Sequence, residues 1–265
     1  MKKSILLIIF SLFLACKSAP PSISENNPTP EIGLITENAM VVSARAEASQ
    51  IASDIMKQGG NAFDAMVATE MALAVSYPFA GSLGGGGFMV FRKANGDIGS
   101  LDFREKAPLA ASKDMYLDES GDAISEKSQL GGLAIGVPGT VAGIFSVHEK
   151  LGSLPIETIL APVVALAKKG YVVSKGQAES FNSHQGLFEK INKTSILYTQ
   201  TFKAGDTVKN IALANTLQRL VDNGRSEYYG GETGEILVDF IQNNGGIITL
   251  EDLKSYETVW RKPIT

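Results

Sequence analysis

The sequence predicts an α+β fold, and three observations support this prediction. Several long stretches carry apolar residues at helical spacing, two short apolar stretches flank the turn pair Asn95-Gly96, and helices and strands do not alternate regularly. Regular alternation would favour a parallel sheet instead. From residue 35 to 265 the chain has the length of one large domain, and 44% apolar residues suffice for a buried core.

Two helices are expected first. Apolar residues recur at helical spacing from 43 to 58, and Gly59-Gly60 ends that pattern. Asn61 can cap the next helix, in which nearly every position from Ala62 to Val75 is apolar or small. This composition is typical of a helix that is buried on most sides, and Pro78 ends it.

Two antiparallel strands are expected next, over residues 88–92 and 98–104. Alternation along the second strand points Leu101 and Phe103 toward the core. The same alternation places Asp102 and Arg104 on the opposite face, at the end of the strand.

The remainder is predicted to be mainly helical. Leu133–Val137, closed by Pro138-Gly139, has the pattern of a short strand. Ser153 is interpreted as the start of a capped helix that Gly170 ends, and Thr249-Leu-Glu-Asp252 as a capping box that opens a short helix. Further helices are expected at 140–151, 175–190, 210–222 and 233–243, and a strand is expected to begin at 259.

The first sixteen residues predict an export signal. Lys2 and Lys3 precede the apolar run Ile5–Leu14, which is too short to span a bilayer permanently. Cleavage after Ala15 would give an ordinary secreted protein. We favour a bacterial lipoprotein acylated at Cys16, because Cys16 is the only cysteine and lies where a lipobox places it. The lipid would anchor an exported protein to a membrane of the periplasm or cell envelope.

Residues 17–34 carry four prolines and little to bury, so they predict an extended tether before the domain at 35–265. With Lys2 and Lys3 removed, 22 basic residues stand against 28 acidic ones, a net charge of about −6. This balance argues against a nucleic acid partner.

The numbers and spacing of cysteines, histidines and other reactive residues exclude most kinds of catalytic centre. A single cysteine permits neither an internal disulfide nor a cysteine metal cluster. His148 and His184 have no second histidine at a metal-binding spacing, so no metal and no cofactor is predicted. The run Gly84–Gly87 leads into a strand and lacks a following Gly-Lys-Ser/Thr, which argues against a nucleotide site. Ser82 has no recognisable partner base.

Arg104 is the strongest candidate for a binding residue. Its planar guanidinium suits a carboxylate, and the run Gly84–Gly87 leaves room beside the backbone for a ligand. Each feature alone has an ordinary explanation: glycines let two backbones pass closely, and an arginine between Asp102 and Glu105 can be a surface ion pair. Together they predict a site for a small zwitterion.

Five motifs, taken together, resemble the γ-glutamyltranspeptidases, also called glutathione hydrolases. They occur in that family's order and bring nearly all of 35–265 into the resemblance. The motifs are Asn61-Ala-Phe-Asp-Ala65, Ala80-Gly-Ser-Leu-Gly-Gly-Gly-Gly-Phe-Met89, Asp102-Phe-Arg-Glu-Lys-Ala-Pro108, Val137-Pro-Gly-Thr-Val-Ala-Gly143 and Asn244-Gly-Gly-Ile-Ile-Thr-Leu-Glu-Asp-Leu253.

The resemblance implies an N-terminal-nucleophile hydrolase, an α/β/β/α sandwich made from a precursor that cuts itself into a large and a small subunit. It implies hydrolysis of glutathione and other γ-glutamyl compounds, and γ-glutamyl transfer to amino acids or dipeptides, through a threonine acyl-enzyme. Arg104 corresponds to the clamp on the substrate's α-carboxylate. The catalytic threonine would lie beyond Thr265, so we expect a truncated large-subunit portion that is inert by itself.

Two alternatives remain open. A β-lactam acylase of the same family would share these motifs. A truncated lipoprotein without activity could instead survive as a binding or interaction module, and the coding sequence beyond Thr265 would distinguish it from an enzyme.

Overall fold

The structure is a computed structural model that describes residues 33 and 35–264. The chain divides into two units, residues 1–38 and 39–265, and the described part of the first is exposed. The expected export signal 1–16, its Cys16 and all of the tether 17–34 except Gly33 lie outside the described residues. Within the described part, no helix is long and apolar enough to cross a membrane.

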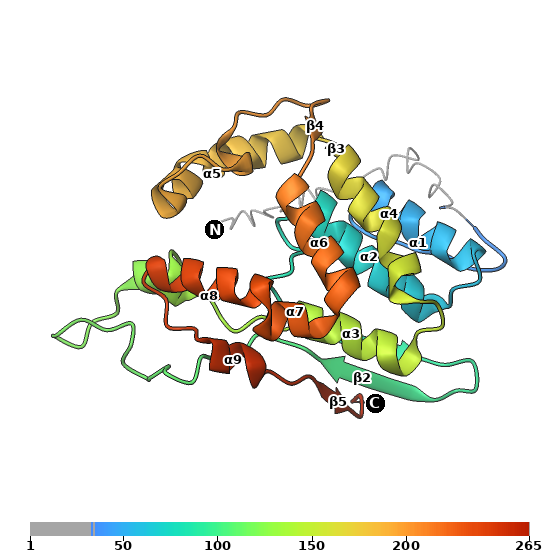
Figure 1. Cartoon of the computed structure of the whole chain (residues 1–265), viewed down its shortest axis with the longest axis horizontal. Coiled ribbons are helices and arrows are strands. Elements are labelled where there is room, and N and C mark those ends of the chain that lie inside the picture. Colours follow the sequence, from blue (N-terminus) through green and yellow to red (C-terminus); the bar gives the residue numbers. More distant parts are fainter. Residues whose placement is uncertain (1–32, 34, 265) are drawn as a thin grey trace, which may run out of the picture. The chain divides into compact units, whose positions relative to one another are not determined.

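Two N-terminal helices form the first layer of the second unit, as the sequence predicts. Helix α1 (Ala46–Lys57) packs against α2 (Ala62–Ser76), whose residues are buried on most sides. Asn61 caps α2 in a reciprocal capping box with Asp64. These two helices lie beside α4 in Figure 1.

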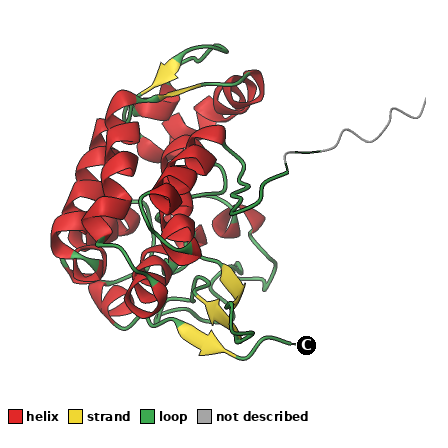
Figure 2. Ribbon diagram, turned by 90° about the vertical axis from the view of Figure 1, so that its right-hand side faces the viewer, coloured by secondary structure: helices red, strands yellow, loops and turns green. Residues whose placement is uncertain are grey.

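A three-stranded antiparallel sheet lies below the helices in Figure 2. Its order is β1 (Phe88–Arg92), β2 (Ile98–Asp102) and β5 (Val259–Arg261). The inner face packs on helices, since Phe91 meets Phe63 of α2 edge-on with ring centroids 5.4 Å apart. The pairing of β2 with β5 joins segments about 160 positions apart along the chain.

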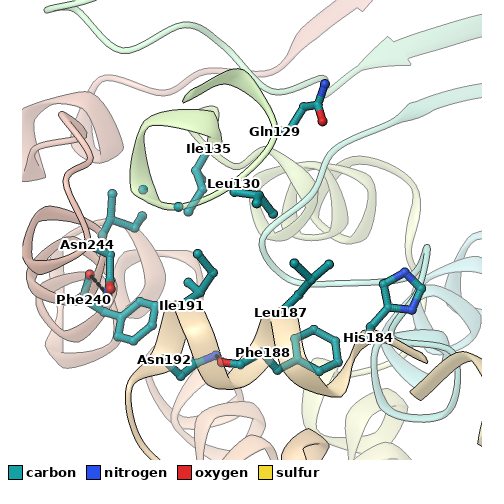
Figure 3. A pocket seen from close by; sticks show the side chains of 13 residues that line it. Gln129, Leu130, Ile135, His184, Leu187, Phe188, Ile191, Asn192, Phe240 and Asn244 are labelled. Carbon is teal, nitrogen blue, oxygen red and sulfur yellow. Dashed lines mark hydrogen bonds between the residues drawn. The ribbon is translucent and has the colours of Figure 1, made fainter. Parts of the chain in front are cut away.

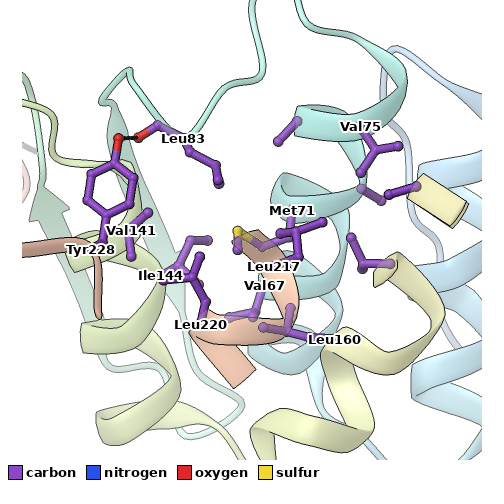
Figure 4. Close-up of a cluster of buried hydrophobic side chains, with 14 of the residues drawn as sticks. Val67, Met71, Val75, Leu83, Val141, Ile144, Leu160, Leu217, Leu220 and Tyr228 are labelled. Atoms are coloured by element: carbon purple, nitrogen blue, oxygen red, sulfur yellow. Dashed lines mark hydrogen bonds between the residues drawn. The ribbon is translucent and has the colours of Figure 1, made fainter. Parts of the chain in front are cut away.

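Helices make up most of the rest. Helix α3 (Thr140–Leu151) covers the sheet, and Figure 4 shows how its residues meet those of α2, α4 and α6 in the main core. The remaining helices and strands are α4 (Ile156–Lys169), β3 (Tyr171–Val172), α5 (Lys175–Asn192), β4 (Thr207–Val208), α6 (Ile211–Asn223), α7 (Arg225–Gly230), α8 (Glu232–Asn243) and α9 (Leu250–Lys254). Three short 3-10 helices span Ser125–Ser128, Gly132–Ala134 and Leu197–Thr199.

The expected strand at Leu133–Val137 is wrong. Residues Gly132–Ala134 form a 3-10 helix, and Gly132 packs directly on the backbone of Gly246. Val137 alone pairs, exchanging two backbone hydrogen bonds with Lys106.

Two expected boundaries also differ. Strand β2 ends at Asp102, although Phe103 continues the pairing through hydrogen bonds with Gly87. Ser153 does not cap α4; its hydroxyl donates to Asp64 Oδ2 at 2.5 Å, and Pro155 precedes the helix instead. The capping box predicted at Thr249 is present.

Candidate active site

The glycine run packs against the loop that carries Arg104. We call residues Phe103–Lys106 the arginine loop. A Cβ added at Gly86 would come within 2.6 Å of the Phe103 carbonyl oxygen and 2.8 Å of the Glu105 nitrogen. The carbonyl of Gly85 accepts hydrogen bonds from the backbone N–H groups of Gly139 and Thr140 at the start of α3. Close backbone approach therefore explains Gly86, and the expected proximity of the glycines to Arg104 holds.

The guanidinium of Arg104 lies at the surface beside that run. Its side chain is 61% exposed, Nε lies 3.1 Å from Glu105 Oε2, and the guanidinium carbon lies 5.8 Å from the centre of the Phe88 ring. Among the described residues, neither terminal nitrogen makes a hydrogen bond. The two terminal nitrogens are thus open to a planar anion such as a carboxylate.

Glu105 holds the inner edge of the guanidinium. Its Oε2 is buried and makes no aligned hydrogen bond within the described part of the chain, so its ion pair with Arg104 is its main polar contact. The neighbouring Gly86 leaves space for this oxygen, because a Cβ there would lie 2.9 Å from it. The sequence predicted Glu105 only as an ion-pair partner of Arg104. Its burial depends on Gly86, which is 19 positions earlier in the chain.

Asp102 holds the other side of the arginine loop. The backbone N–H of Arg104 donates to Asp102 Oδ1 at 3.1 Å, and Arg261 donates to Asp102 Oδ2 from two nitrogens at 3.0 and 2.9 Å. The bond from Arg104 and the charge of Arg261 hold the pKa of Asp102 below its ordinary value, although partial burial acts against them. The carboxylate therefore stays charged at neutral pH.

Arg104 lies at one end of an uncovered sheet face. Alternation in β1 turns Met89 and Phe91 inward and leaves Phe88 and Val90 65% and 72% exposed. Residues 98 and 259 of the neighbouring strands continue this face, whose apolar members are Phe88, Val90, Ile98 and Val259. An exposed apolar surface of this kind is typical of an interface.

Two cavities lie away from Arg104. A cavity of about 290 Å³ between α5, α8 and residues 129–135 is lined mainly by apolar side chains (Figure 3). His184 on its rim contacts the carbonyl oxygen of Ser180 through Nδ1 at 2.8 Å. A second cavity holds Glu70, whose pKa is raised by burial, beside Met56 and Met66.

The two histidines lie apart. His148 lies on α3, and its Nε2 is 2.8 Å from the carbonyl oxygen of Leu154 in the turn before α4. Within residues 33 and 35–264, no group of three His, Cys, Asp or Glu side chains could hold a metal ion.

Comparisons with known proteins agree with the motifs. A sequence model of the family described as Gamma-glutamyltranspeptidase matches residues 48–265. The chain is 42% identical over 233 residues to the glutathione hydrolase proenzyme of Escherichia coli, covering 86% of this chain and 40% of that protein.

Solved structures give the same result. The crystal structure of the Helicobacter pylori γ-glutamyltranspeptidase superposes with a TM-score of 0.83 at 40% identity, over 87% of this chain and 67% of that one. The Pseudomonas nitroreducens γ-glutamyltranspeptidase gives a TM-score of 0.81 at 39% identity, over 86% and 68% of the two chains. The chain thus spans less than half the length of the E. coli proenzyme.

Proposed function

The chain belongs to the γ-glutamyltranspeptidase family, and we propose that it supplies the α-carboxylate clamp of an enzyme that hydrolyses glutathione and other γ-glutamyl compounds. The single observation that carries this proposal is the geometry of Arg104. Its Nε is paired with Glu105, whose carboxylate lies against Gly86, and its side chain is 61% exposed, which leaves the guanidinium accessible to a ligand.

Family membership also settles the fold. The N-terminal-nucleophile hydrolase class expected from the motifs is confirmed, and the described elements form its large-subunit portion. In such an enzyme the nucleophile comes from another part of the precursor, so the contribution of this chain is to hold the substrate.

The proposed reaction depends on how the charge of Arg104 matches the charge of a γ-glutamyl substrate. A γ-glutamyl substrate carries an α-carboxylate at the end opposite the amide that is cut. Two parallel hydrogen bonds from Arg104 would fix that end and leave the γ-carbonyl projecting away from the sheet toward the nucleophile. A threonine would take the γ-glutamyl group from the leaving amine as an ester, which water or the amine of an amino acid or dipeptide would then release.

The small subunit of the same precursor is the proposed partner. The uncovered face of β1, β2 and β5 supports this proposal, since it exposes the apolar side chains of Phe88, Val90, Ile98 and Val259 and has Arg104 at its edge. A second sheet packed there would bury Phe88 and Val90 and place its own side chains next to the guanidinium.

Acylation of Cys16 and location in the bacterial cell envelope are part of the same proposal. Support comes from the sequence pattern of residues 1–16. Labelling cells with a radioactive or alkyne fatty acid should mark the parent protein and leave Cys16→Ser unlabelled. Equal labelling of both would remove Cys16 as the lipid site.

Arg104 substitutions test the clamp. In the protein expressed from the complete reading frame, Arg104→Lys and Arg104→Ala should raise KM for γ-glutamyl-p-nitroanilide about ten- to hundredfold, because hydrogen bonds to charged groups contribute about 1.5–3 kcal/mol. Lys175→Ala, which removes an exposed charge at the start of α5, is the control and should leave KM unchanged. Equal KM for Arg104→Ala and the parent would exclude the clamp.

Substrate preference distinguishes a γ-glutamyl hydrolase from a β-lactam acylase. The parent should cleave γ-glutamyl-p-nitroanilide and glutathione in preference to the side-chain amide of a cephalosporin. Preference for the cephalosporin would favour the β-lactam acylase, whose substrate need not present an α-carboxylate to Arg104. A stop codon directly after Thr265 would favour the inactive binding module.

A further inference from the structure

We propose that Tyr256, supported by Arg261, positions the backbone of Arg104 and so determines how tightly the guanidinium holds a carboxylate. The inference rests on the proposed function, because it names the part of the fold that orients the proposed clamp. Tyr256 and Arg261 bound a segment, residues 256–261, that runs from the end of α9 through β5. We call it the clasp segment; it lies below α3 and beside β2 in Figure 1.

Tyr256 holds the carbonyl side of Arg104. Its hydroxyl donates a hydrogen bond of 2.8 Å to the Arg104 carbonyl oxygen, across 152 positions of sequence. The Tyr256 side chain is only 2% exposed. The hydroxyl fits because position 139 is glycine: a Cβ at Gly139 would collide with it and with the carbonyl of Phe103.

Arg261 holds the amide side through Asp102. The Arg104 N–H donates to one oxygen of Asp102, and Arg261 donates twice to the other. Both backbone groups of Arg104 are therefore fixed from the clasp segment, one directly and one through a single carboxylate. A third contact joins the same segments, because Lys106 Nζ donates to the Glu257 carbonyl at 2.7 Å.

Tyr256 is itself rigidly held. Its ring stacks on Tyr229 with centroids 5.7 Å apart and an interplanar angle of 19°. The Tyr229 hydroxyl donates to the Pro138 carbonyl at 2.9 Å and accepts from the Ala142 N–H at 3.1 Å, which ties both rings to the start of α3. Arg225 lies over the Tyr229 ring and donates to the Tyr256 carbonyl.

This arrangement matters because the Arg104 side chain is long and exposed. Within the described part of the chain, its side chain makes an ion pair with Glu105 and a contact with Phe88, and otherwise its position is set by its backbone. Loss of either backbone bond lets the arginine loop shift, and shifts of about 1 Å in a positioning group are costly in enzymes. The expected defect is weaker recognition of the α-carboxylate, with the chemical step little changed.

The test compares two substrates in the protein made from the complete reading frame. One is γ-glutamyl-p-nitroanilide, and the other is the same compound with its α-carboxylate converted to a carboxamide. The ratio of their kcat/KM values measures recognition of the carboxylate and is independent of how much enzyme is folded.

Tyr256→Phe keeps the ring and removes the hydroxyl. We expect this variant to lower the ratio about three- to tenfold through KM, with kcat within about twofold of the parent. Arg261→Gln should lower the ratio in the same direction, and it decides the question if Tyr256→Phe does not accumulate. Tyr116→Phe is the control, since it removes a tyrosine hydroxyl that donates to Leu133, outside the arginine loop.

The outcomes separate this inference from the proposed function. If Arg104→Lys lowers the ratio while Tyr256→Phe and Arg261→Gln match Tyr116→Phe, the positioning role is overturned and the clamp stands. If Arg104→Lys leaves the ratio unchanged, or the parent cleaves neither substrate, the proposed clamp falls and the positioning role falls with it. Lower kcat on both substrates with an unchanged ratio would indicate a structural role only and would also overturn the inference.

Discussion

Gly86 is the position in the glycine run where a side chain cannot fit. A Cβ there would meet the backbone of Phe103 and Glu105 and the Glu105 carboxylate, all within 2.9 Å. Gly84, two positions earlier, is open, with nothing within 4 Å of an added Cβ. Gly86 and Gly84 are therefore a matched pair, one without room for a Cβ and one with open space.

Gly86→Ala should destabilise the protein by about 1–3 kcal/mol, because the arginine loop must move to admit the methyl group. It should also raise KM for γ-glutamyl-p-nitroanilide, since Glu105 would shift with the loop. Gly84→Ala should change neither quantity. Thermal unfolding and steady-state kinetics of the two variants check this, and similar behaviour of both would show that the contact with Phe103 and Glu105 is unimportant.

Some residue roles could be predicted from the sequence and others could not. The alternation that buries Leu101 and Phe103 and exposes Arg104 is local, so a period of two was enough to predict it. The hydrogen bond from Tyr256 to Arg104 joins positions 152 apart. No local pattern reports such a contact, and Tyr256 was not predicted as part of the site.

Helix α2 is joined to the turn before α4 by one buried carboxylate. Asp64 is fully buried, and it accepts hydrogen bonds from the Asn61 N–H at 2.8 Å and from the N–H and hydroxyl of Ser153 at 2.9 and 2.5 Å. Burial acts to raise the pKa of Asp64, but these hydrogen bonds outweigh it and hold the pKa below the ordinary value of 3.8.

A depressed pKa stabilises the folded state above the ordinary value and loses that contribution as pH falls through the folded value. At pH 7, Asp64→Asn should therefore lower the free energy of unfolding by about 1–3 kcal/mol. The difference between parent and variant should shrink as pH falls below 3.8. Asp239→Asn, on the exposed side of α8, controls for loss of a surface charge. A difference that stays constant from pH 7 to pH 3 would contradict the assignment.

Most elements were predictable because their signals are local. Helical spacing, the cap at Asn61 and the Asn95-Gly96 turn gave helices α1 to α6 and the β1–β2 hairpin within a few residues. The apolar stretch at Leu133–Val137 was misassigned because Gly132, directly before it, packs against α8 and the loop that follows that helix, a contact that a strand pattern does not reveal. The pair β3–β4 and helix α7 are two and six residues long, too short for periodicity to detect.

In the second unit, one face of the three-stranded sheet is covered by helices and the other face is exposed. The inner face packs on α2 and α3, while Phe88, Val90, Ile98 and Val259 on the other face are exposed. This asymmetry fits a chain that spans 40% of the E. coli proenzyme and less than 70% of the two solved relatives. Assembly with the proposed small subunit should depend on that face.

Val90→Lys should therefore reduce the yield of assembled two-subunit enzyme several-fold, because a lysine would be buried without a partner between the two sheets. Val172→Lys changes another exposed strand valine, on β3, and should assemble normally. Gel filtration and detection of both subunits measure the yield. Normal assembly of Val90→Lys would show that the uncovered face is not the interface.

The most direct test of the central claim is a crystal structure of the complete protein with glutamate bound. The account predicts that the two terminal nitrogens of Arg104 each lie about 2.7–2.9 Å from an oxygen of the glutamate α-carboxylate, with Nε still paired to Glu105. Glutamate bound with its α-carboxylate on other residues, and Arg104 directed into solvent, would contradict it.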